Sequence, residues 1–243
     1  REHMNEHVVN VIMMLAACGA FLVGFKFLSD NMEKLFGSSL KQLFNKTSDQ
    51  KLVGVGMGAV STAVVQSSGI TTVMVVGFVN SGTMLLSQAV GVIMGANVGT
   101  AVTAWLTALN GIEGGAEAAA WLEWLKPDAW MPILALIGIC LLMFAKKAKL
   151  KDVGTILLGF AVLMTGMDIM SQAVSGLKND PGFCQMLTMF ENPILGVLAG
   201  TILTAVVQSS SASIGILQAL AIGTGAISFG AAIPIILGQN IGT

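Results

Sequence analysis

The sequence predicts an all-α integral membrane protein made of two inverted repeats. Of its 243 residues, 54% are hydrophobic and only 10% are charged, and the mean hydropathy is +0.81. Soluble domains carry about 25% charged residues, so this composition indicates a chain surrounded by lipid. One polar heptapeptide, TAVVQSS, occurs twice, at Thr62–Ser68 and Thr204–Ser210. The net charge of −1 gives no sign of nucleic-acid binding.

The first predicted element is a spanning helix over Val8–Leu28, since about 20 apolar residues cross a bilayer. Arg1–His3 precede a methionine and are interpreted as a cloning scar, so residues 1–7 form a tag scar and the extracellular end. In the lysine-rich stretch Asp30–Lys51, apolar residues recur at helical spacing. This pattern predicts an amphipathic helix on the membrane surface.

Two apolar stretches follow, Leu52–Val65 and Ile70–Val79, and each is too short to span a bilayer alone. The polar letters QSSG separate them. Two interpretations compete: a re-entrant hairpin over residues 52–82 with Gln66–Gly69 at its tip, or one broken crossing. The same question applies to the second heptapeptide.

The remaining elements complete a first repeat over residues 8–150 and a second repeat over residues 151–243. In order, they are a broken span over 87–109, a span over 130–145, a span over 153–174, a hairpin over 193–223 and the start of a broken span over 228–243. The two broken spans carry the related motifs GANVGT, at Gly95–Thr100, and GQNIGT, at Gly238–Thr243.

Lysine placement decides how residues 52–82 cross the membrane, because lysine-rich loops stay cytoplasmic. A hairpin puts the lysine-rich loops 30–51 and 146–152 on one face and the acidic loop 111–128 on the other. A single crossing would put the two lysine clusters on opposite faces. The hairpin therefore satisfies the charge rule and places the N-terminus outside.

The duplication extends beyond the heptapeptide. Three glycines of the first repeat align with three of the second at the offset of 142 that takes residue 62 to residue 204: Gly24, Gly54 and Gly58 with Gly166, Gly196 and Gly200. After one inserted residue, GANVGT aligns with GQNIGT. The spacing of these glycines also predicts close packing between helices.

Each repeat is predicted to cross the membrane three times, and an odd number of crossings inverts the second copy. Inverted repeats are typical of secondary transporters, whose substrate site lies near the midplane where the copies meet. The second repeat lacks a counterpart of Ala101–Leu150. We therefore expect a longer natural protein, of which this chain is truncated at its C-terminal end.

A hairpin tip at membrane depth offers two kinds of ligand. The arm before the tip ends in carbonyl oxygens, which suit Na⁺, and the arm after it begins with N–H groups, which suit an anion. Asn97 and Asn240 are predicted to lie where their helices break, adding oxygen ligands for a hard cation. A lone QSS could serve packing alone, but its duplication beside N-x-G-T favours a ligand site.

Asp168 is the repeat partner of Lys26 and lies within a predicted span. An ionisable residue inside the membrane is a functional candidate, so Asp168 is predicted to act in an ion pathway or in gating; the alternative is a hydrogen bond within the bundle. The sequence shows no His-Cys-Asp cluster, Walker motif or G-x-S-x-G motif. We expect neither enzymatic activity nor an organic cofactor.

The paired QSS and N-[VI]-G-T motifs resemble the type II sodium-dependent phosphate cotransporter family, and most closely its bacterial branch. The resemblance implies that Na⁺ entry drives transport of inorganic phosphate by alternating access. It implies phosphate contacts from Gln66, Ser67, Ser68, Gly69, Gln208, Ser209, Ser210 and Ser211. It implies Na⁺ contacts from Gln66, Ser68, Asn97, Thr100, Gln208, Ser210, Asn240 and Thr243.

The same resemblance implies a multi-pass protein of the inner (plasma) membrane, with phosphate, Na⁺ and the bilayer as partners and a second copy of the chain as a candidate partner. The first tip reads QSSG, so Gly69 stands where the second tip has Ser211, and the site is expected to be asymmetric. Two alternatives stay open: an anion exporter or channel that is not coupled to Na⁺, and a membrane module that senses phosphate.

Overall fold

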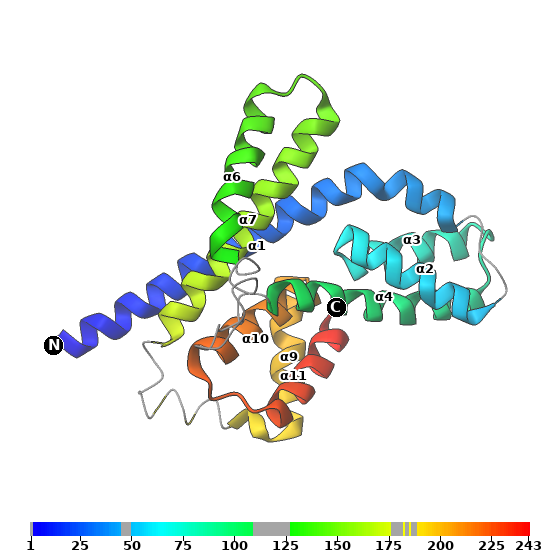
Figure 1. Ribbon diagram of the computed structural model, residues 1–243. Helices are drawn as coiled ribbons and strands as arrows, with labels where there is room; N and C mark the ends of the chain where they lie inside the picture. Colours follow the sequence, from blue (N-terminus) through cyan, green and yellow to red (C-terminus); the bar gives the residue numbers. More distant parts are fainter. Residues whose placement is uncertain (1, 45–49, 109–126, 176–181, 183–184, 186–188) are drawn as a thin grey trace, which may run out of the picture.

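The computed structural model describes residues 2–44, 50–108, 127–175, 182, 185 and 189–243 (Figure 1). These residues form nine α-helices and one short 3-10 helix, without any strand. Their bounds are α1 Glu2–Phe44, α2 Lys51–Val65, α3 Ser68–Asn80, α4 Leu86–Ala108, α6 Pro127–Phe144, α7 Ala148–Ser175, η2 Met189–Glu191, α9 Pro193–Val207, α10 Ser210–Thr224 and α11 Phe229–Gly242. The all-α prediction is confirmed.

Three of these helices are long and apolar enough to cross a membrane: Val8–Phe44 within α1, α4 and α7. The predicted hairpin arms are shorter helices, as expected for segments of 13 to 15 residues. The predicted span over 153–174 lies within α7, whereas the predicted span over 130–145 falls on α6, whose apolar part Trp130–Phe144 is one of the shorter helices. The predicted acidic loop over 111–128 lies almost entirely outside the described residues.

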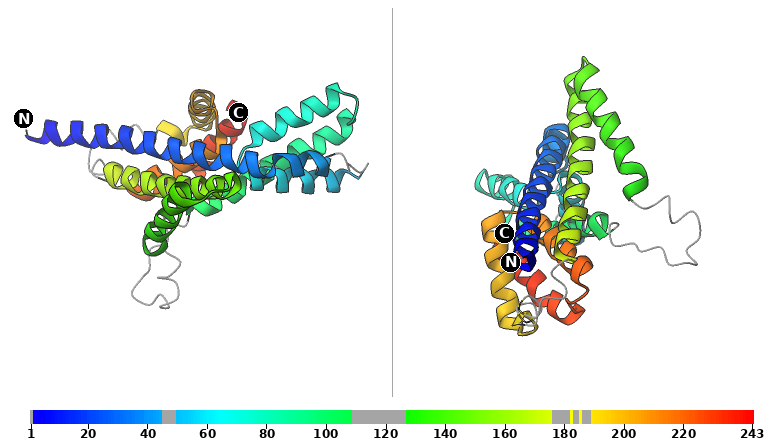
Figure 2. Two further views of the ribbon diagram at one scale, coloured as in Figure 1. Left: turned by 90° about the horizontal axis from the view of Figure 1, so that it is seen from above. Right: turned by 90° about the vertical axis from the view of Figure 1, so that its left-hand side faces the viewer.

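The prediction of a spanning helix followed by a separate amphipathic helix is wrong, because α1 is one continuous helix. The polar residues at its middle are satisfied within the helix: Asn31 Nδ2 donates to the Phe27 carbonyl at 2.7 Å, and Lys26 Nζ lies 3.2 Å from Asp30 Oδ2. At roughly 1.5 Å per residue, α1 is about 65 Å long, about twice the thickness of the hydrocarbon core. It runs along the whole molecule (Figure 2).

The segments α2 and α3 fold back on each other as a helical hairpin, with Thr62 Oγ1 3.1 Å from Thr71 Oγ1 across it. The next helix, α4, runs parallel to α2. A Cβ added at Gly91 would lie 3.1 Å from the carbonyl of Lys51, and one at Gly99 would lie 2.4 Å from the carbonyl of Ala59. Since α4 starts beside the start of α2, α3 must return the chain to that end.

The breaks predicted at Asn97 and Asn240 are wrong, because α4 runs unbroken through GANVGT and α11 runs unbroken to Gly242, past Asn240 of GQNIGT. The glycines of these motifs serve close packing instead. A Cβ at Gly95 would lie 1.9 Å from the carbonyl oxygen of Val55 in α2, and one at Gly238 would lie 2.0 Å from that of Val197 in α9. The predicted close packing of the glycine faces is confirmed.

The two repeats share this packing contact by contact. A Cβ at Gly58 would lie 1.9 Å from the Val92 carbonyl oxygen, and at the equivalent positions a Cβ at Gly200 would lie 2.0 Å from the Ile235 carbonyl oxygen. The α9–α11 pair therefore reproduces the α2–α4 pair. The aligned glycines of the sequence thus occupy equivalent places in the structure.

Between the repeats, α1 and α7 are antiparallel and exchange equivalent contacts. A Cβ at Gly24 would lie 2.4 Å from the backbone nitrogen of Leu163, and one at Gly166 would lie 2.6 Å from that of Phe21. Residue 24 aligns with 166, and 21 aligns with 163. Each helix therefore presents the same surface to the other, as the two subunits of a twofold dimer do.

The two hairpins, however, are packed differently. In the second repeat, Gly215 of α10 lies against the fully buried Phe21, whose Cζ would be 2.4 Å from an added Cβ. The equivalent pair in the first repeat is Val73 and Leu163, yet Val73 is 72% exposed. The second hairpin is thus anchored on the buried Phe21 of α1. In the first hairpin, the equivalent face of α3, which carries Val73, is exposed.

Candidate functional site

Each hairpin turns at a glutamine in the left-handed region. Gln66 and Gln208 both have φ 60° and ψ 24°, and their backbone N–H groups donate to the carbonyls of Thr62 and Thr204 at 2.7 Å. A non-glycine residue pays about 1–2 kcal/mol for this conformation. Glycine would avoid that penalty, so two glutamines at this position point to a role for their side chains.

The residue after each glutamine begins the second arm. Ser67 and Ser209 are extended and cap α3 and α10, their hydroxyl oxygens accepting from the backbone N–H groups of Ile70 at 3.3 Å and Ala212 at 3.2 Å. The first turn of a helix presents N–H groups without partners in the helix, and the helix dipole favours an anion there. Both tips therefore combine hydroxyls with an anion-attracting helix start.

The two glutamine side chains lie in different surroundings. Both Nε2 groups donate back into their own arm, to the carbonyls of Ala63 and Ala205. Gln66 is only 3% exposed, and its Oε1 accepts from Thr103 Oγ1 of α4 at 2.6 Å. Gln208 is exposed.

Residues of both tips line one cavity together with residues of α1. A cavity of 810 Å³ is lined by Ser67 and Gly69 of the first tip and by Gln208 of the second. A smaller cavity of 360 Å³ beside it is lined by Ser67, Gln208 and Ser209. Tips that are far apart in the sequence thus contribute hydroxyl and amide groups to the same space.

Other predicted ligands lie away from these two cavities. Ser68, Ser210 and Ser211 are buried in the first turns of α3 and α10. Thr100 and Thr243 donate to carbonyls one turn earlier in their own helices, at 3.1 Å and 3.0 Å. Asn97 and Asn240 are exposed on α4 and α11 and line neither cavity.

Asp168 also lies outside both cavities. It is half-buried on α7 and accepts a hydrogen bond from Gln172 Nε2 at 2.8 Å. A role of Asp168 in an ion pathway or in gating stays a prediction.

The helix α1 contributes to the site in a way that the sequence did not indicate. Its polar face lines the larger cavity with Asp30, Glu33, Lys34, Gly37, Ser38 and Lys41. Ser29 Oγ also donates to the carbonyl of Val65, the last residue of α2, at 3.2 Å. The polar positions recur every three or four residues along α1, a spacing that a surface helix and a cavity-lining helix share.

Apolar helices whose polar turns meet at one cavity are the architecture of a membrane transport protein. The chain belongs to the Na⁺/Pi-cotransporter family, whose model matches residues 20–172 and 180–243. The resemblance seen in the sequence is thereby confirmed, and this is a family of transporters rather than of enzymes.

Several curated proteins are similar to the chain. The "Putative inorganic phosphate export protein YjbB" of Escherichia coli (strain K12) is 25% identical over 237 residues, which are 97% of this chain and 40% of that protein. The "Uncharacterized protein YqeW" of Bacillus subtilis (strain 168) is 28% identical over 92% of this chain and 67% of its own length. The "Sodium-dependent phosphate transport protein 2B" of Homo sapiens is 31% identical over 43% of this chain and 15% of its own length. The chain thus spans 40% of the length of YjbB, and no solved structure matches it.

The bond between Thr103 and Gln66 gives a first prediction. Thr103→Val should lower the free energy of unfolding by about 1–3 kcal/mol, because it leaves the buried Oε1 of Gln66 without its donor. Thr103→Ser keeps a hydroxyl and should recover most of the loss. The measurement is unfolding of the purified protein in detergent. Thr165→Val is the control, since Thr165 is exposed and its hydroxyl donates to the Ala161 carbonyl in its own helix; equal losses at both positions would contradict the prediction.

Proposed function

We propose that this chain is the membrane part of a secondary transporter that couples Na⁺ entry to the transport of inorganic phosphate. The observation that carries the proposal is the shared cavity, in which Ser67 of one hairpin tip faces the same space as Gln208 and Ser209 of the other. Hydroxyls, an amide and two helix starts are suitable ligands for an oxyanion. The family membership supports phosphate as that oxyanion.

In this proposal the two helical hairpins are re-entrant and belong to inverted repeats, 8–150 and 151–243. The antiparallel packing of α1 on α7 with exchanged contacts supports it, because a twofold axis perpendicular to two antiparallel helices inverts one repeat relative to the other. The lysine-rich segments 30–51 and 146–152 are then cytoplasmic and the N-terminus is outside, in the inner membrane.

Coupling follows from the charges of the substrates. No lysine or arginine occurs from Leu52 to Leu125, so the first hairpin tip and α4 provide no side-chain cation for phosphate. The lysines that line the cavities, Lys26, Lys34 and Lys41, all belong to α1, and the carboxylates of Asp30 and Glu33 on the same helix offset part of their charge. Bound Na⁺ adds positive charge at the tips themselves, held at the carbonyl ends of α2 and α9, where the helix dipole is negative. The remaining family positions, including Ser68, Ser210, Asn97 and Asn240, are proposed to join the site in other states of the cycle.

The unequal packing of the hairpins supports alternating access. The second hairpin is anchored through Gly215 on Phe21, while the equivalent Val73 of the first is exposed. A transporter with two equivalent halves needs two states in which their roles are exchanged. The described arrangement corresponds to one of them.

The test is phosphate uptake by the full-length protein in proteoliposomes, with an imposed Na⁺ gradient or with K⁺ in place of Na⁺. We expect uptake that follows the Na⁺ gradient and disappears in K⁺. Flux that is equal in Na⁺ and K⁺ would instead support the second candidate, phosphate export without Na⁺ coupling, which the similarity to YjbB favours. Binding of phosphate without flux would indicate a sensor.

A further inference from the structure

The α6–α7 hairpin projects from the rest of the molecule in both Figure 1 and Figure 2. Its two helices touch through glycines: a Cβ at Gly138 would lie 2.8 Å from the Gly154 carbonyl oxygen, and one at Gly154 would lie 2.8 Å from that of Gly138. Beyond this contact the helices continue to a short turn at Ala145–Lys147. The shared cavity is lined by residues of α1, α3 and the two hairpin tips, and not by residues of α6 or α7.

This free end holds an apolar pocket. The pocket has a volume of 510 Å³ and is lined by apolar side chains and one thiol, among them Ile137, Cys140, Phe144 and Leu150. Phe144 is 77% exposed. A pocket of this composition has no group that could hold a polar solute, but its surface matches a hydrocarbon chain.

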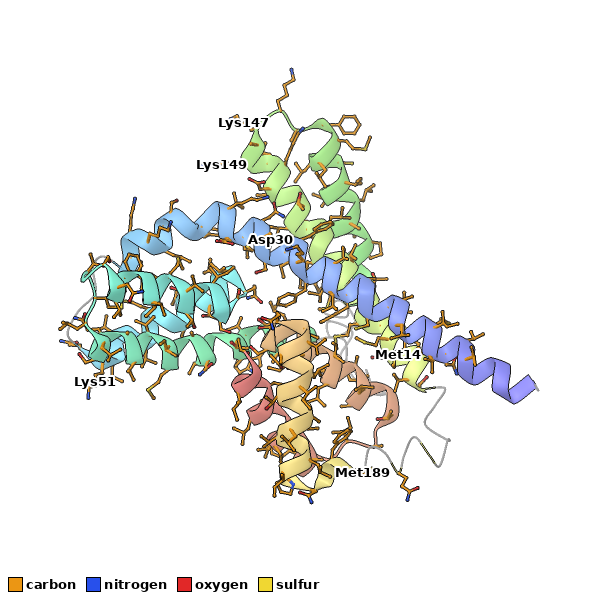
Figure 3. All side chains as sticks on the ribbon, turned by 180° about the vertical axis from the view of Figure 1, so that it is seen from behind. Met14, Asp30, Lys51, Lys147, Lys149 and Met189 are labelled. Carbon is orange, nitrogen blue, oxygen red and sulfur yellow. The ribbon has the colours of Figure 1, made fainter. Side chains whose placement is uncertain are left out.

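A cluster of lysines lies directly beside the pocket. Lys146, Lys147, Lys149 and Lys151 are all exposed, and the same segment carries one acidic residue, Asp152. Figure 3 shows Lys147 and Lys149 at the free end of the hairpin. Leu150, which lines the pocket, stands between two of these lysines in the sequence. The apolar pocket and the lysines beside it are arranged as the acyl chain and the charged headgroup are arranged in a phospholipid.

We propose that this end of the α6–α7 hairpin binds an anionic phospholipid. One acyl chain occupies the pocket between α6 and the start of α7, and the phosphate lies among the lysine ammonium groups. A zwitterionic lipid fills the pocket equally well but compensates less of the lysine charge. Each lysine near an anionic headgroup is expected to favour it by about fivefold.

The test uses the full chain in nanodiscs and brominated lipids, which quench nearby tryptophan fluorescence. Phe144→Trp places the reporter in the pocket wall. Ile133→Trp is the matched control, because Ile133 is 58% exposed on the same helix and belongs to neither the pocket nor the lysine cluster. Quenching is recorded as the difference from the parent protein. We expect brominated phosphatidylglycerol to be preferred over brominated phosphatidylcholine by about fivefold or more at residue 144, and equally bound at residue 133.

Two further variants separate charge from pocket. Changing Lys146, Lys147 and Lys149 to glutamine should remove the preference at residue 144, and Cys140→Phe, which fills the pocket, should weaken quenching there by both lipids. Equal quenching by the two lipids at residue 144 would overturn the proposal. So would a preference that survives the lysine changes, or quenching that Cys140→Phe leaves unaltered.

Discussion

Replacing Gln208 with glycine should reduce the proposed Na⁺-driven phosphate uptake by roughly 10- to 100-fold, the range expected when a hydrogen bond to a charged ligand is lost. Glycine adopts φ 60° without strain, so the turn between α9 and α10 is kept while the amide that lines both cavities is removed. The measurement is the initial rate of uptake into proteoliposomes over a range of phosphate concentrations.

Gln66→Gly is the matched control for this change. It removes the same side chain from the same backbone conformation, but the Gln66 amide is buried and bonded to Thr103 rather than exposed at the cavity. We expect Gln66→Gly to lower the free energy of unfolding, because the buried bond to Thr103 is lost, whereas Gln208→Gly should leave the free energy of unfolding nearly unchanged. An equal loss of stability in the two variants would contradict the different surroundings of these glutamines.

Gly58→Ala should destabilise the protein by about 1–3 kcal/mol. The added Cβ would lie 1.9 Å from the Val92 carbonyl oxygen, and because this atom is backbone, α2 and α4 must move apart to admit it. Gly200→Ala should repeat the effect in the second repeat, where the distance to the Ile235 carbonyl oxygen is 2.0 Å. Unfolding of the purified variants in detergent measures both losses.

Two residues away on the same helix, Gly56 provides the control. Nothing lies within 4 Å of a Cβ added there, so Gly56→Ala should stabilise α2 by about 0.5–1 kcal/mol through helix propensity alone. If Gly58→Ala and Gly56→Ala had the same stability, the close approach of α2 and α4 would be wrong.

The hairpin arms could be predicted from the sequence because local signals bound them. The hairpin predicted over 193–223 starts at Pro193, where α9 also starts. This helix is capped by Asn192 and ends before the left-handed Gln208. The breaks predicted at GANVGT and GQNIGT failed because glycine has two uses that look alike in a sequence. It can interrupt a helix or let another backbone approach, and only the position of the neighbouring helix decides between them.

The site was predicted less completely. The repeat of TAVVQSS marked both tips, but identical letters gave no sign that Thr103 would bury one glutamine while the other stays exposed. The polar face of α1 was missed because its role depends on how a long helix packs across both tips. Lys34 and Lys41 line the cavity together with Gly69, a juxtaposition that arises from tertiary packing alone.

Because α1 and α7 exchange equivalent contacts, the two halves of the chain can be compared with each other within one molecule. The glycine contacts across this interface have twins in the same chain: the pair Ala17 and Gly166 corresponds to Gly159 and Gly24. Probes attached at one pair and then at its twin would report the same value if the two halves were equivalent at that moment. The difference between twin distances therefore measures how far the chain has departed from twofold symmetry, without a second structure for comparison.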